Sequence, residues 1–286
     1  MRTIGTVVRG VRAPIFQAGD DLAKEVCKAV LAASEEAQAP LRDRDVIAVT
    51  ESVVARTQGN YATLEQIAAD VRAKIPAGAD GKRTAAVVFP ILSRNRFSML
   101  LKGISMGVDK LYIVLKYPSD EVGNELISLD RLEEKGVDPY RDVLTEAKYR
   151  ELFGENVLHP FTGMDYVKLY REYARNSEIL LANDARAVLP YAQDVIACDI
   201  HTRARTVRLL KEAGARTALT LADLLNAPVD GSGYNPDFGL YGSNLATENS
   251  VKLFPRDCEK FVEKLAGMLR AESGKQVEVM VYGDGA

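Results

Sequence analysis

Short apolar runs alternate with amphipathic helical patterns along the whole chain. The runs most typical of strands cover residues 46–49, 84–89, 110–117, 177–183 and 194–198. Those at 46–49, 84–89 and 194–198 are typical of strands buried on both faces of a sheet. Helical patterns cover residues 22–33, 63–75, 91–107, 164–175, 185–192, 204–213 and 255–273. We therefore predict an α/β (α+β) fold built on a mixed sheet.

Both ends of the chain are predicted to form strands, at 3–11 and 277–282. Asp20 and Asp21 precede the helix at 22–33. We interpret them as helix caps, because an Asp at a helix start accepts hydrogen bonds from free N–H groups. Asp284 follows the last strand between two glycines, where small residues leave room for a cation or a phosphate. The chain stops two residues later, so we expect the natural protein to continue beyond its last residue.

Charge and composition exclude several classes of protein. The 37 Lys and Arg residues nearly balance the 40 Asp and Glu residues, and this argues against nucleic-acid binding. No apolar run approaches the roughly 20 residues of a membrane helix. The three cysteines form no CxxC pair, so a reducing cytoplasm is the expected compartment. His159 and His201 are the only histidines, so a metal would be held mainly by oxygen ligands.

Several well-known motifs are missing. The sequence contains no GxxxxGK[ST], no GxGxxG after a strand and no GxSxG. A Rossmann-like oxidoreductase with its cofactor site at 194–214 is therefore disfavoured, because it would need a Gly-rich turn. Cys27 lies on the apolar face of a helix and is expected in the core rather than as a nucleophile. His159 falls in a loop, and the sequence identifies no partner for it.

Polar and basic residues follow the apolar run at 194–198. His201 and Arg203 lie near the start of the next helix, beside Thr202. Helix N-termini and Arg side chains both favour anions. We predict that His201 and Arg203 lie at the rim of a pocket for an acidic ligand, formed by the middle of the chain. The alternative is a role in helix capping and surface charge.

Two blocks of the sequence resemble a known enzyme family. The first block comprises the loop 13–16, the Gly-Asp-Asp-Leu motif at 19–22 and the segment 45–59. The second comprises Gly-Leu-Tyr-Gly-Ser-Asn at 239–244 and the strand and loop at 279–285. Together they resemble the coenzyme F-420:L-glutamate ligase (gamma-glutamyl ligase) family. The resemblance implies one ligase-like domain over 1–286, with 90–235 as a long inserted segment.

The resemblance also implies an activity. Members of that family attach L-glutamate to the deazaflavin precursor F-420-0, using GTP and Mg²⁺ or Mn²⁺. By this resemblance the chain is a ligase of small-molecule substrates that forms an acyl-phosphate, and we expect a cytoplasmic homodimer. A folate-like pterin or another carboxylic acid is the alternative acceptor.

Particular residues acquire roles from the same resemblance. Asp284 is implied to bind the divalent metal, and Arg56 to meet the phosphates of the nucleotide. The nucleotide-binding set that it implies is Ala13, Pro14, Ile15, Phe16, Glu51, Arg56, Ser243 and Asn244. These residue types suit the tasks, because an Arg fork pairs with phosphate and a carboxylate supplies hard oxygens to Mg²⁺.

The sequence departs from the family pattern at several positions. Tyr241 stands where the family has a metal-binding Asp, and a neutral Tyr is a poor ligand for Mg²⁺. Ser52 stands in place of a family Lys, and Gly285 in place of a Thr. We expect Glu51 or Asp237 to supply the missing carboxylate. Tyr241 also favours an alternative, a nucleotide- or anion-binding protein of the same fold without ligase activity.

Overall fold

The computed structural model describes residues 5–283 and divides them into two compact units. The first unit comprises residues 5–60 and 255–283, and the second comprises residues 61–254. The sequence analysis expected one domain with residues 90–235 inserted. In the structure that stretch lies inside the second unit and supplies most of its central sheet. The predicted α/β class is confirmed.

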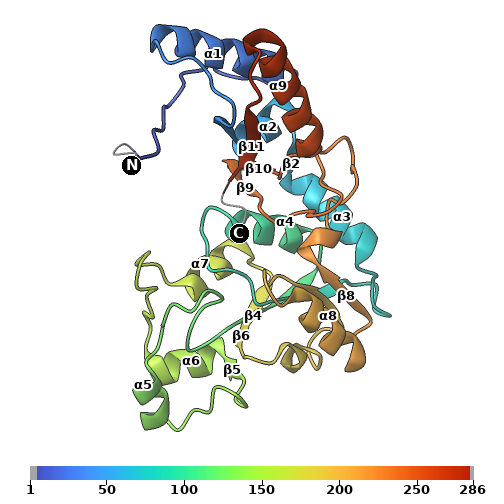
Figure 1. Cartoon of the computed structure of the whole chain (residues 1–286). Helices are drawn as coiled ribbons and strands as arrows, with labels where there is room; N and C mark the ends of the chain where they lie inside the picture. Colours follow the sequence, from blue (N-terminus) through green and yellow to red (C-terminus); the bar gives the residue numbers. More distant parts are fainter. Residues whose placement is uncertain (1–4, 284–286) are drawn as a thin grey trace. The chain divides into compact units, whose positions relative to one another are not determined.

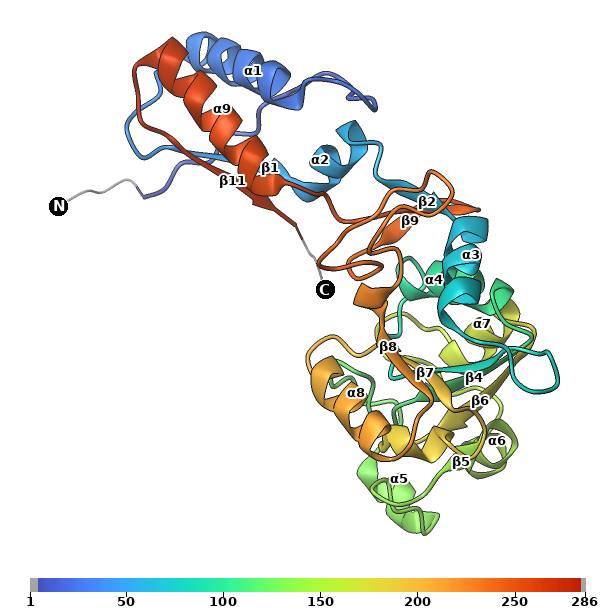
Figure 2. The same ribbon diagram turned by 90° about the vertical axis from the view of Figure 1, so that its right-hand side faces the viewer.

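The first unit packs two long helices on a small parallel sheet. Strand β1 (Val46–Thr50) pairs in parallel with β11 (Glu278–Tyr282), so residues far apart in the sequence become neighbours. Helices α1 (Leu22–Glu36) and α9 (Cys258–Ser273) lie side by side in Figures 1 and 2. The core of this unit is apolar and contains Phe16, Leu22, Val26, Cys27, Val49, Leu265 and Leu269. Cys27 is thus a core residue, as predicted.

The cap prediction is confirmed for Asp21 but wrong for Asp20, whose partner Gln17 precedes the helix. The Asp21 side chain accepts a hydrogen bond from the backbone N–H of Lys24 at the start of α1. Asp20 accepts one from the N–H of Gln17, at 2.7 Å. Helix α2 (Glu51–Thr57) was not predicted, although it lies in the segment 45–59 that resembles the ligase family.

The prediction of a strand at 3–11 is wrong for the residues that the structure describes. Residues 5–11 form no strand, and Val8 is 88% exposed. Alternating apolar residues give β-propensity, but a strand also needs a neighbouring strand to satisfy its N–H and C=O groups. Strand β1 is only partly buried, so the prediction that it is buried on both faces is also wrong. The reason is that it belongs to a sheet of two strands rather than to a covered central sheet.

The second unit is built on a six-stranded sheet in the order β5-β6-β4-β3-β7-β8. Its strands are β3 (Thr84–Val88), β4 (Lys110–Leu115), β5 (Leu144–Thr145), β6 (Ser177–Leu181), β7 (Asp194–Ala197) and β8 (Thr217–Thr220). All pairs are parallel except that of β5 with β6. Among the parallel strands, the first along the chain lies between the second and the fourth. This is a doubly wound order, and the chain reverses its direction of winding between β3 and β7.

Helices cover both faces of this sheet. Figure 2 shows α8 (Arg203–Glu212) on one side, and α3 (Leu64–Lys74), α4 (Phe97–Met106) and α7 (Tyr166–Tyr173) on the other. Side chains alternate along each strand, so Val87 and Ile113 face α4 while Val88 and Val114 face the opposite layer. Full burial on both faces explains why these strands are continuous apolar runs.

Shorter elements complete the second unit. They are α5 (Leu129–Glu134), α6 (Glu146–Phe153), the 3₁₀ helices η1 (Ala185–Val188) and η2 (Leu221–Asp223), and the antiparallel sheet of β2 (Tyr61–Thr63), β10 (Ser250–Lys252) and β9 (Asn244–Thr247). The predicted helix at 185–192 is thus a single 3₁₀ turn. The strands β2, β5, β8, β9 and β10 were not predicted, because they are short and, unlike β7, are not continuous buried apolar runs. Within residues 5–283, no helix combines the length and apolar character needed to cross a bilayer.

Gly103 allows α4 to pack closely on α3, and Gly103→Ala is expected to destabilise the protein by about 1–2 kcal/mol. An added Cβ would lie 2.9 Å from Cγ2 and 3.0 Å from Cβ of Ile67, both too close. Gly267 in α9 is the matched control, because a Cβ there meets nothing within 4 Å. Gly267→Ala is expected to stabilise by about 0.5–1 kcal/mol through helix propensity. Urea unfolding followed by circular dichroism measures both, and effects of the same sign would contradict this packing.

Candidate functional site

A pocket opens at the carboxyl ends of β3 and β7, where the winding of the second unit reverses. In doubly wound sheets this crevice is the general place for ligands. The pocket has a volume of about 190 Å³. We call it the switch-point pocket, and it is lined by Ile91, Arg96, Phe97, Leu100, Cys198, Ile200, Arg203, Leu221, Phe238, Leu240, Tyr241, Gly242, Ser243 and Phe254. Its walls are therefore mostly apolar, with a few polar groups.

Tyr241 fixes one wall of the switch-point pocket to the end of β7. Its hydroxyl donates to the backbone carbonyl of Asp199 at 3.0 Å, with Ala197 O at 3.3 Å. Burial raises the pKa of Tyr241 far above its ordinary value, so the phenol stays neutral. Gly242 has a φ of 69°, and a Cβ there would overlap the ring of Phe254. Only glycine fits this position, which explains part of the Gly-Leu-Tyr-Gly-Ser-Asn motif.

Two polar groups of the pocket matter for its chemistry. Within the described chain the buried Ser243 hydroxyl has no hydrogen-bond partner. The guanidinium of Arg203 lies over the Tyr241 ring at 4.8 Å and donates from Nη1 to Ile200 O. Arg203 thus lies at a pocket, as predicted, but residues 238–254 complete the lining together with the middle of the chain. The same prediction is wrong for His201, which is exposed and not part of the lining. That the ligand is an acid stays a prediction.

Asp199 lies in the connection between β7 and α8, between two residues that line the pocket, Cys198 and Ile200. The residue is fully buried, and its Oδ2 accepts from the hydroxyls of Thr202 at 2.6 Å and Thr206 at 3.1 Å. Its Oδ1 has no hydrogen-bond partner among residues 5–283. The carboxylate therefore faces α8 rather than the switch-point pocket, whose lining does not include it. The hydroxyls of Thr202 and Thr206 thus bind a carboxylate of the protein and not one of a ligand.

A partly buried ion pair, formed by Lys116 and Glu121, lies at the same edge of the sheet. Glu121 forms an ion pair with Lys116 at 2.5 Å, and its side chain is almost fully buried. Burial raises the pKa of Glu121, and the Asp199 carboxylate adds to this, while Lys116 opposes it. Nζ of Lys116 also lies over the ring of Phe89, 4.9 Å from its centre. Phe89 is the residue directly after β3. This pair was not predicted, although Lys116 lies near the end of the predicted strand at 110–117.

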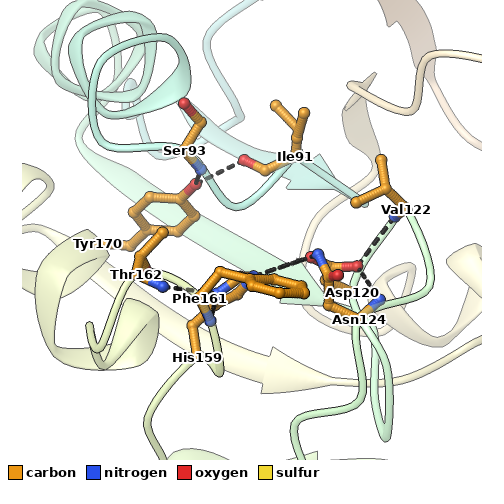
Figure 3. Close-up of polar contacts among 9 residues, drawn as sticks. All are labelled: Ile91, Ser93, Asp120, Val122, Asn124, His159, Phe161, Thr162 and Tyr170. Atoms are coloured by element: carbon orange, nitrogen blue, oxygen red, sulfur yellow. Dashed lines mark hydrogen bonds and ion pairs between the residues drawn. The ribbon is translucent and has the colours of Figure 1, made fainter.

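His159 belongs to a buried polar network (Figure 3). Its Nδ1 accepts from the backbone N–H groups of Phe161 at 3.2 Å and Thr162 at 3.3 Å. The proton is therefore on Nε2, which lies 3.2 Å from Oδ2 of Asp120. Asp120 also accepts from the N–H of Val122 and from the N–H and side chain of Asn124. The network joins two loops, and the sequence analysis missed it because the two partners are 39 residues apart.

Tyr170 ties the loop that forms one pocket wall to α7 (Figure 3). Its hydroxyl donates to Ile91 O at 2.7 Å and accepts from the N–H of Ser93 at 3.1 Å. Both bonds hold the connection between β3 and α4. The position of Ile91 in the switch-point pocket therefore depends on a fully buried side chain of α7.

In the first unit, the end of the small sheet brings Glu51 against the end of β11. Thr50 pairs with Tyr282, so the next residues on the two strands are Glu51 and Gly283. A Cβ at Gly283 would overlap the carboxyl group of Glu51, so the two are in close contact. The predicted metal ligand Asp284 lies outside the described residues.

The remaining predicted site residues occupy contrasting environments. Ala13, Pro14 and Ile15 are exposed, whereas Phe16 is buried in the core of the first unit. Arg56 is exposed in the last turn of α2. Asn244 begins β9 in the second unit and donates to Gly242 O at 3.2 Å. Among residues 5–283, no group of three or more His, Cys, Asp or Glu side chains is arranged to hold a metal ion.

Comparison with known families decides what kind of protein this is. The model of the F420-0:Gamma-glutamyl ligase family matches residues 10–285, nearly the whole chain. The chain belongs to this family. It is therefore an enzyme that forms C–N bonds, and the predicted resemblance is confirmed. A comparison with curated proteins gave no match.

The extent of the match changes how this gamma-glutamyl ligase is understood. In the sequence, only the two end blocks resemble the family, and the middle segment carries no recognisable motif. The family match runs through that segment as well. The doubly wound sheet and its switch-point pocket are therefore part of the matched region of the ligase.

Proposed function

We propose that this ligase attaches L-glutamate to a carboxylic acid acceptor, with F-420-0 as the first candidate, using GTP and Mg²⁺ or Mn²⁺. An oxygen of the acceptor carboxylate attacks the γ-phosphorus of GTP, and GDP leaves. The amine nitrogen of glutamate then attacks the acyl carbon, phosphate leaves, and the nitrogen loses a proton. Family membership, with the match over residues 10–285, is the observation that carries this proposal.

The first unit has groups that suit the phosphoryl chemistry. Glu51 has its carboxyl group at the end of the small sheet, against Gly283, and Asp284 is the next residue in the sequence. Carboxylate oxygens are the ligands that Mg²⁺ and Mn²⁺ prefer, so Glu51 and Asp284 would hold the ion. A bound divalent ion neutralises charge on the transferred phosphoryl group. This donor set fits the metal without a contribution from Tyr241.

The nucleotide would meet exposed residues of the same unit. Arg56 is exposed at the end of α2, and its guanidinium could pair with phosphate oxygens. Ala13, Pro14 and Ile15 offer an accessible loop, anchored by the buried side chain of Phe16. The homodimer, the cytoplasmic location and the contacts of Ser243 and Asn244 with the nucleotide stay predictions.

A direct assay tests the proposed reaction. Incubation with F-420-0, L-glutamate, GTP and Mn²⁺ is expected to give one amide product, GDP and phosphate in equal amounts, detected by mass spectrometry. A parallel reaction with a pteroic acid tests the folate-like acceptor. Product from the pterin alone would reassign the acceptor, and no GDP or amide with either acid would contradict the proposal.

Asp284→Asn is expected to lower Mn²⁺ affinity and turnover about 100-fold, a loss of about 2.7 kcal/mol, because the neutral amide replaces a charged ligand. Calorimetric titration with Mn²⁺ gives the affinity without relying on turnover. Glu278→Gln is the matched control, since Glu278 is an exposed carboxylate on the adjacent strand β11. Unchanged Mn²⁺ affinity in Asp284→Asn would exclude this residue as a metal ligand.

A further inference from the structure

The switch-point pocket lies in the second unit, and among residues 5–283 its lining contains none of the residues assigned above to the metal or the phosphates. Ser243 is the one lining residue that also belongs to the predicted nucleotide-binding set. We propose that the pocket binds a small carboxylic acid with an apolar body, with Arg203 and Ser243 holding the carboxylate. This inference concerns binding alone and does not depend on the identity of the ligase substrates.

The charge of the lining favours an anion. Arg96 and Arg203 line the pocket, and no Asp or Glu does. Asp199, the nearest carboxylate along the chain, is turned to the hydroxyls of α8. Burial raises the pKa of the Cys198 thiol well above its ordinary value, so this lining residue is neutral. A positively charged guanidinium in a largely apolar cavity favours a ligand of opposite charge.

Arg203 retains donors that a carboxylate can use. A guanidinium carries five N–H groups, and Nη1 of Arg203 bonds to Ile200 O. In the described chain, no hydrogen bond of its Nε or Nη2 to another residue is present. The Tyr241 ring lies against one face of the guanidinium and supports it by a cation–π contact. A planar edge with parallel N–H groups matches the two oxygens of a carboxylate.

Ser243 supplies the second, independent observation. Its hydroxyl is buried, lines the pocket and has no hydrogen-bond partner among residues 5–283. A buried hydroxyl without a partner costs about 1–3 kcal/mol. A ligand oxygen that accepts from Ser243 would remove that cost, so the pocket is incomplete without an acceptor.

The size and walls of the pocket define the rest of the ligand. A volume of about 190 Å³ is below the roughly 300–1,000 Å³ of sites for drug-sized molecules. A nucleotide is therefore too large for it. The walls include the side chains of Phe97, Leu100, Phe238, Leu240 and Phe254, which favour an apolar body such as a phenyl or branched alkyl group.

Calorimetric titration of the full chain with phenylacetate and 4-methylpentanoate tests the proposal. We expect one saturable site for at least one of these acids. Affinity should fall at least tenfold in Arg203→Gln and in Ser243→Ala, and phenylacetamide should bind at least tenfold more weakly than phenylacetate. Arg205→Gln, at an exposed position of the same helix, is the matched control and should bind as the parent does.

Three results of these titrations would contradict a carboxylate site in the switch-point pocket. Absence of binding for both acids, equal binding of the amide, or unchanged affinity in both pocket variants would overturn the proposal. Inorganic phosphate is the competitor, and displacement at equal concentration would show a general anion site instead. Urea unfolding of each variant separates loss of the ligand contact from loss of the fold. None of these results bears on ligase turnover, so the two proposals fail separately.

Discussion

Asp165→Ala is expected to lower the free energy of unfolding by about 3–5 kcal/mol, because it leaves a buried guanidinium without its partner. Arg150 donates to both oxygens of Asp165, at 2.7 and 2.9 Å, and the two side chains are only 8% and 6% exposed. Asp165 also caps α7 by accepting from the N–H of Lys168. Urea unfolding monitored by circular dichroism measures the change.

An exposed pair provides the matched control for Asp165. Lys148 and Glu151 form an ion pair of similar length on the surface of α6, at 2.7 Å. Glu151→Ala is expected to cost less than about 1 kcal/mol, since solvent screens such pairs. Equal effects of the two substitutions would contradict a special role for the buried pair.

Asp120→Ala is expected to destabilise the protein by about 3 kcal/mol, because the buried Asp120 carboxylate accepts several hydrogen bonds. The N–H groups of Val122 and Asn124 and the Nε2–H of His159 would lose their acceptor. Asp138→Ala, which removes an exposed turn carboxylate, is the control and should cost less than about 1 kcal/mol. A small effect at Asp120 would show that the network of Figure 3 adds little to stability.

The same network predicts a dependence on pH. Burial opposes ionisation of Asp120, but the bonds from Asn124, His159 and Val122 outweigh it and hold the pKa of Asp120 below its ordinary value. The carboxylate therefore contributes stability that is fully present above its unfolded pKa, about 3.9. That stability is lost as pH falls through the lower folded pKa. The stability difference between the parent and Asp120→Ala should shrink in unfolding curves measured toward pH 3.

Local features of the fold follow from the sequence. The strands β3, β4, β6 and β7 lie within two residues of their predicted ends, because buried parallel strands are continuous apolar runs. Asp21 caps α1 as predicted, because a cap depends only on the first turn of its own helix. The blocks at both ends of the sequence were also enough to identify the gamma-glutamyl ligase family.

The site depended on contacts between distant parts of the chain. Arg203 was expected at a pocket from its place after a strand, but Ser243, in the lining of the same pocket, follows 40 residues later. A missing Gly-rich turn disfavoured a Rossmann-type cofactor site, yet the sheet has the doubly wound order. Phe89 and Pro90 follow β3 at the place where a Gly-rich turn would stand. The sheet therefore has the doubly wound strand order without the Gly-rich motif.

The sequence by itself determined the long helices and the buried strands β3, β4, β6 and β7, because periodicity and capping act within a few residues. It could not determine strand order, the isolation of residues 5–11, or the pairing of Asp120 with His159. Only the tertiary structure decided these features. The backbone groups of a strand and a buried carboxylate both need hydrogen-bond partners, and folding brings those partners from distant parts of the chain.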